Sequence, residues 1–157
     1  MNHVKKLLPL LIIGLIPLQT IAYTNIKKDT TKVHIVGTDQ MKFTVTSIKA
    51  SPGELMKVTL TTKSDFPPAA MSHDFVLLTQ NSDAQKVAQS CAHFRDNDYI
   101  DPDMKKYIVA HTALAGGGET VSVTFHAPQK PGDYEYICTF PGHFSAGMKG
   151  TLTVKAD

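Results

Sequence analysis

A cysteine, a histidine and a methionine lie close together near the C-terminus, at Cys138, His143 and Met148. A thiolate and an imidazole with a weak thioether are typical ligands of copper, whereas magnesium and calcium take oxygen ligands. Strand-like runs precede and follow the segment, and Pro141-Gly142 and Gly147 favour turns between them. One short loop can therefore direct three ligand atoms at a single ion.

A copper site of this kind needs a second histidine from elsewhere in the fold. His73 directly precedes Asp74 and the apolar run 75–78, which is typical of a strand buried on both faces. A hydrogen-bonded core histidine is about as common at such a place, but the C-terminal segment needs a partner, so we expect His73 to be the distant ligand. His93, His111 and His126 lack the spacing of a second metal site, and we expect surface or structural roles for them.

The two cysteines of the chain, Cys91 and Cys138, allow a different interpretation. An even number of cysteines in an exported protein is consistent with a disulfide. The spacing of His143 and Met148 after Cys138 favours a metal ligand, which leaves Cys91 as a small core residue on a helix face. Zinc also accepts thiolate and imidazole, although its sites rarely use methionine.

The first part of the 157-residue chain has the pattern of an export signal. Lys5 and Lys6 precede the apolar run 7–16, and Ala22 offers a small residue before a cleavage point. We therefore expect a signal peptide at 1–22, a flexible lead-in at 23–30 and one domain at 31–157 in the periplasm, with an uncleaved membrane anchor as the alternative. We expect no stable membrane insertion after the signal is removed.

The mature chain carries no overall charge. Without Lys5 and Lys6, the 16 basic residues become 14, equal to the 14 acidic residues. No basic block interleaved with aromatic residues remains, which argues against nucleic-acid binding. We expect local surface patches to decide the choice of partner.

Alternation of polar and apolar residues predicts most of the elements. Short alternating runs near 32–36, 41–45, 56–60, 121–125, 134–138 and 149–155 are separated by turn residues, with further short strands at 75–78 and 107–110. Residues 83–106 change to helical spacing, and Ser82 and Gln85 have the spacing of a capping box. The pattern predicts an all-β, Greek-key β-sandwich of about eight strands with one short helical insert.

Several stretches of the chain resemble the azurin branch of the blue-copper cupredoxins. These stretches are 37–41 (GTDQM), 71–77 (MSHDFVL), 108–112 (IVAHT), 122–125 (SVTF) and 138–143 (CTFPGH). The resemblance covers nearly all of the chain from about Thr31 onward. The gap between His143 and Met148 is one residue longer than in azurin itself and is similar to that of the auracyanins.

The resemblance implies four copper ligands. They are His73, Cys138, His143 and Met148. It also allows a fifth contact from the backbone carbonyl of Ser72, where the family usually has glycine. It further implies that the backbone N–H groups of Asp74 and Phe140 point at the Cys138 sulfur. The Asp74 side chain, which is usually asparagine in azurins, is expected to tie the two ligand loops together.

The function implied is that of a soluble type 1 copper protein that carries single electrons outside the cytoplasm and is not an enzyme. His143 is expected at the surface edge, within an apolar docking patch for cytochrome-type donors and for reductase or peroxidase acceptors. The patch residues are Met71, Phe140, Pro141, His143 and Phe144. The alternative is a copper storage or delivery module, which methionine-rich or histidine-rich tracts would favour, and the sequence contains none.

Overall fold

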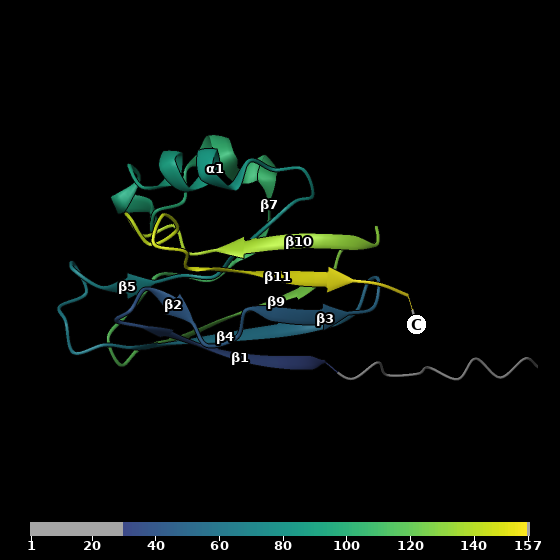
Figure 1. Ribbon diagram of the computed structural model, residues 1–157, viewed down its shortest axis with the longest axis horizontal. Coiled ribbons are helices and arrows are strands. Elements are labelled where there is room, and N and C mark those ends of the chain that lie inside the picture. The colour runs from purple at the N-terminus through teal and green to yellow at the C-terminus, as the bar shows by residue number, and fades with distance from the viewer. Residues whose placement is uncertain (1–29, 157) are drawn as a thin grey trace, which may run out of the picture.

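Two facing sheets form the body of the computed structural model, which describes residues 30–156 (Figure 1). The first sheet has the order β2 (Lys42–Phe43), β1 (Thr31–Thr38), β4 (Leu55–Lys63) and β9 (Thr120–His126). The second has the order β3 (Ser47–Ala50), β11 (Lys149–Val154), β10 (Gly132–Ile137), β6 (Val76–Leu78) and β7 (Ile108–His111). A separate pair joins β5 (Ser72–His73) to β8 (Ala115–Gly116).

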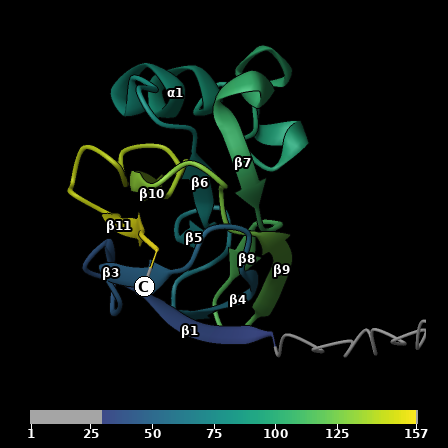
Figure 2. The same cartoon turned by 90° about the vertical axis from the view of Figure 1, so that its right-hand side faces the viewer.

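The arrangement is the predicted β-sandwich with one short helix. β1 runs parallel to β4 and β3 runs parallel to β11, while the other pairs are antiparallel. Figure 2 shows β1, β4 and β9 in one layer and β10 and β11 in the other. The predicted run 41–45 contains β2, but sequence alternation did not reveal β3, β5 and β8. Strand β3 lies between the predicted runs 41–45 and 56–60, and the two-residue strands β5 and β8 are too short to show a period of two.

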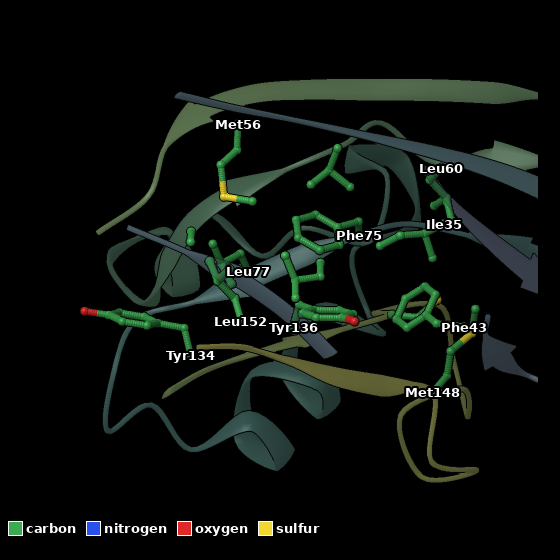
Figure 3. Close-up of a cluster of buried hydrophobic side chains, with 14 of the residues drawn as sticks. Ile35, Phe43, Met56, Leu60, Phe75, Leu77, Tyr134, Tyr136, Met148 and Leu152 are labelled. Carbon is green, nitrogen blue, oxygen red and sulfur yellow. The ribbon is translucent and has the colours of Figure 1, made fainter. Parts of the chain in front are cut away.

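The core lies between the inner faces of the two sheets (Figure 3). Strand β4 shows why: Met56, Val58 and Leu60 are fully buried while the residues between them are more exposed. Tyr136 of β10 packs its ring 5.0 Å from that of Phe75. The sandwich therefore provides a rigid base beneath the loops at one end.

The helical insert covers the outer face of β6 (Figure 2). It contains α1 (Ala84–Cys91) and two short 3₁₀ helices, η1 (Arg95–Asn97) and η2 (Pro102–Tyr107). The predicted capping box is wrong: the Asp83 carboxylate caps α1 by accepting from the Lys86 N–H at 3.0 Å, and the Ser82 hydroxyl pairs with Thr79 instead.

Two further expectations concern the N-terminal part of the chain. The signal peptide at 1–22 and all but the last residue of the lead-in at 23–30 lie outside the described residues. The sequence also predicts a turn at Gly37-Thr38-Asp39, directly after the alternating run 32–36. The turn lies slightly later, because β1 continues through Thr38 and the Met41 N–H donates to the Thr38 carbonyl at 2.9 Å. Within 30–156, no helix is long and apolar enough to cross a membrane.

Candidate metal centre

The candidate ligands come from two segments at the same end of the sandwich. His73 lies on β5, while Cys138, His143 and Met148 lie between β10 and β11. Backbone hydrogen bonds fold this second segment on itself: the Met148 N–H donates to the His143 carbonyl at 3.0 Å, and the Cys138 N–H donates to the Met148 carbonyl at 3.2 Å. Gly142 and Gly147 have positive φ, as their predicted turns require.

Two imidazoles and one thiol converge on a single point. The Nδ1 atoms of His73 and His143 are 3.1 Å apart. The Cys138 sulfur lies 3.4 Å from Nδ1 of His143 and 3.9 Å from Nδ1 of His73. The three side chains are at most 2% exposed. The structure thus brings together three of the predicted site residues, and His73 comes from a position 65 residues before Cys138 and 70 residues before His143.

The spacing of these atoms fits a trigonal metal site. Nitrogen and sulfur ligands lie about 2.0–2.3 Å from an ion such as zinc, so three of them at 120° are about 3.5–3.8 Å apart. The observed separations of 3.1, 3.4 and 3.9 Å fall around that range. Two imidazoles and one thiolate are the equatorial donors of a blue-copper site.

Burial sets the protonation of these groups. It lowers the pKa of both His73 and His143 to about 4, so both imidazoles are neutral at neutral pH and have lone pairs to offer. Burial, with the nearby Asp74 carboxylate, raises the pKa of the Cys138 thiol well above its usual value. The thiol therefore binds a metal only by giving up a proton.

Asp74 joins the two ligand segments, as predicted. Its carboxylate accepts the Thr139 N–H at 2.7 Å and also the Thr139 hydroxyl. The N–H groups of Asp74 and Phe140 act on the Cys138 sulfur, where they favour the thiolate. Complete burial raises the pKa of Asp74 to about 6 despite the bonds from Thr139. Asp74 follows His73 and Thr139 follows Cys138, so the hydrogen bonds between them hold the two ligand segments together.

Met148 and Ser72 lie beside this cluster. Met148 is fully buried, and its side chain points into the end of the core that holds Phe43 (Figure 3). Its backbone is tied to both His143 and Cys138. Ser72 is 1% exposed, and its hydroxyl donates to the Pro68 carbonyl at 2.7 Å.

Sequence reasoning missed one neighbour of the cluster, Gly37. A Cβ at this position would lie 2.4 Å from Cδ2 of His73 and 2.7 Å from its Cγ. Gly37 is not at a positive φ, so close approach, not backbone freedom, explains the glycine. Gly37 directly follows the alternating run 32–36, a position that also resembles a turn, so the sequence carried no distinct signal for this contact.

The positions of the two cysteines and of the histidines test several of the predictions from the sequence. Cys91 and Cys138 are both free, and Cys91 is buried in the cluster beneath α1, so the disulfide interpretation is wrong. The three histidines that we expected at the surface or in structural roles are exposed: His93, His111 and His126. The expected surface-edge position of His143 is wrong, since this side chain is only 2% exposed.

Comparison with known proteins agrees with this geometry. A family profile described as copper binding proteins, plastocyanin/azurin family, matches residues 30–155. Azurin of Pseudomonas aeruginosa is 41% identical over 126 residues, covering 78% of this chain and 84% of that protein. Auracyanin A of Chloroflexus aurantiacus, whose structure is described as that of a "blue" copper protein, superposes with a TM-score of 0.71 at 30% identity, covering 81% of this chain and all of that one.

Auracyanin-B of Chloroflexus aurantiacus is 35% identical over 117 residues, which cover 74% of this chain and 48% of that protein. Both the azurin and the auracyanin likenesses expected from the motifs are therefore confirmed. The chain is a non-enzymatic electron carrier with an azurin-like type 1 copper site, and its partners are redox proteins. It belongs to the plastocyanin/azurin family of copper-binding proteins.

Proposed function

We propose that His73, Cys138 and His143 would hold the copper ion, with the Met148 thioether as a further, weak ligand. The observation that carries the assignment is the convergence of two imidazole Nδ1 atoms and the Cys138 sulfur within 3.9 Å. Copper supplies a reversible one-electron change at such a site. The Ser72 carbonyl precedes His73 and is proposed as an optional fifth contact.

The protein's own contribution is to hold these donors still. Both histidines are neutral and nearly or fully buried, and the bond between Asp74 and Thr139 fixes one ligand segment against the other. N–H groups directed at the Cys138 sulfur stabilise the thiolate and tune the reduction potential. Burial of all three donors suits retention of the ion better than its delivery to another protein.

We further propose that redox partners dock over the ligand loop. Pro141 is exposed, Met71 and Phe144 are half-buried, and Phe140 packs its ring 4.7 Å from that of His143. A partner on this apolar surface is separated from the copper ligands by little more than one side chain. Cytochrome-type donors and reductase or peroxidase acceptors are the classes of partner we propose, and a small contact suffices for such transient binding.

The proposed location is the periplasm, reached through the signal peptide at 1–22, with residues 31–157 as the mature copper domain. An expressed full-length chain tests this placement, because export yields a product that begins near Tyr23. A full-length product that stays membrane-bound would support the uncleaved anchor instead.

The ligand assignment is tested by the visible spectrum. Copper-loaded, oxidised protein should be intensely blue and lose the colour with ascorbate, and Cys138→Ser should abolish the colour. Cys91→Ser is the matched control: Cys91 is the last residue of α1, is buried in the cluster of the helical insert and is not among the converging ligands, so the spectrum should not change. Blue absorption retained in Cys138→Ser would overturn the assignment.

A further inference from the structure

A pocket opens beside the ligand loops, on the side of the helical insert. It has a volume of about 350 Å³ and is lined by Pro68, Ser72, Arg95, Tyr99, Leu114 and Phe140. Ser72 directly precedes the ligand His73, and Phe140 lies between the ligands Cys138 and His143. An occupant of this pocket therefore contacts both ligand-bearing segments at once.

Aromatic rings connect the pocket to the proposed copper site. The Tyr99 ring meets the edge of the Phe140 ring at a centroid distance of 5.1 Å. The Phe140 ring lies 4.7 Å from the His143 ring. One aromatic side chain therefore separates the pocket from a proposed ligand, which is a short distance for an electron to cross.

The pocket contains one cation that has no partner. The Arg95 side chain is exposed and makes no hydrogen bond or ion pair with any residue of 30–156. The other two cations near the ligand loop are engaged: Lys149 pairs with Glu135 at 2.9 Å, and Lys42 donates to the Ala146 carbonyl.

The acidic residues closest to Arg95 in sequence, Asp96 and Asp98, do not line the pocket. Its walls are instead a proline, a leucine and aromatic rings, with the Ser72 hydroxyl already bonded to the Pro68 carbonyl. A guanidinium over an apolar wall binds a planar carboxylate well, because it offers paired donors in a partly desolvated place.

We propose that this pocket receives a carboxylate of the redox partner, so that the partner of this protein presents an acidic side chain next to its own redox group. The proposal rests on the proposed function and adds the partner's chemistry. Because the mature chain carries no overall charge, Arg95 supplies the local attraction that orients the encounter.

The first test uses benzoate as a probe of the pocket. In reduced, copper-loaded protein, an NMR titration with benzoate should shift the amide signals of Leu114 and Phe140, whereas neutral benzyl alcohol should bind several-fold more weakly. Arg95→Gln should weaken benzoate binding at least threefold. Lys57→Gln, at an exposed lysine on β4, should leave it unchanged. Equal binding to the parent protein and Arg95→Gln would overturn the proposal.

The second test measures electron transfer. Reduction of the blue protein by anionic hexacyanoferrate(II) should be roughly threefold slower in Arg95→Gln at low salt, with the difference lost at high salt. Reduction by cationic hexaammineruthenium(II) should not slow. A protein that never turns blue would refute the proposed function itself. A blue protein whose Arg95→Gln and Lys57→Gln variants are reduced at equal rates would refute only the role of Arg95.

Discussion

Replacing Gly37 with alanine tests whether β1 sets the position of a copper ligand. The added Cβ would lie 2.4 Å from Cδ2 of His73, whereas ordinary contacts begin near 3.4 Å. The imidazole or the strand must therefore move by about 1 Å. Gly37 pairs with Phe43 on one side and Thr62 on the other, so the strand has little freedom and the imidazole moves.

The expected result is a changed copper site in a folded protein. Overpacking of this kind costs about 1–3 kcal/mol of stability. Displacement of one ligand by about 1 Å should weaken copper binding roughly 10- to 100-fold, the usual effect of disturbing the support of a metal ligand. The blue band and the electron paramagnetic resonance hyperfine coupling should shift, and a copper titration followed at the blue band measures the affinity.

Gly118→Ala is the matched control for Gly37→Ala. Gly118 has a φ of +80°, and a Cβ there would have no neighbour within 4 Å. Alanine in this conformation costs about 1–2 kcal/mol through backbone strain alone. Similar losses of stability with a changed spectrum only in Gly37→Ala would confirm the reasoning. A wild-type spectrum and copper affinity in Gly37→Ala would refute it.

Three further predictions follow from the same site. Burial raises the folded-state pKa of Asp74 from 3.8 to about 6, so this carboxyl stabilises copper-free protein most below pH 4 and loses that contribution as the pH rises through 6. Asp74→Asn should therefore gain about 2 kcal/mol relative to wild type between pH 4 and pH 7, as measured by urea unfolding, and a pH-independent difference would contradict this. Copper(II) loading at pH 7 should release about one proton per ion from the Cys138 thiol, measured in weakly buffered solution, and Cys138→Ser should release none. Met148→Leu should keep the blue colour and raise the reduction potential in voltammetry, and an unchanged potential would remove Met148 from the site.

The ligands could be predicted from the sequence because their signal is local. Cys138, His143 and Met148 lie within one loop, and His73 stands at the start of a strongly apolar strand. The alternating strands were readable for the same reason, since each of them buries one face.

What the sequence did not show depends on contacts between distant segments. The approach of Gly37 to His73 joins strands that are far apart in the chain, and a glycine after an alternating run resembles a turn. The cap of α1 was misassigned by one residue, since Ser82 and Asp83 are both good caps and Thr79 competes for the serine hydroxyl. Burial of His143 depends on how the surrounding loops pack, which no local pattern encodes.

The hydrogen bonds that join the proposed ligand segments use backbone groups and the side chains of Asp74 and Thr139. The Cys138 and His143 segments are held through backbone groups, and the two ligand segments are joined by Asp74 and Thr139. None of these bonds uses either Nδ1 atom, and the Cys138 sulfur only accepts from the N–H groups of Asp74 and Phe140, which favours the thiolate form. The ligand geometry is therefore set by the sandwich and its loops, and it can stay nearly constant when the charge of the ion changes. Small rearrangement on electron transfer is what a carrier between redox proteins requires, so the same bonds that stabilise the fold also support its function.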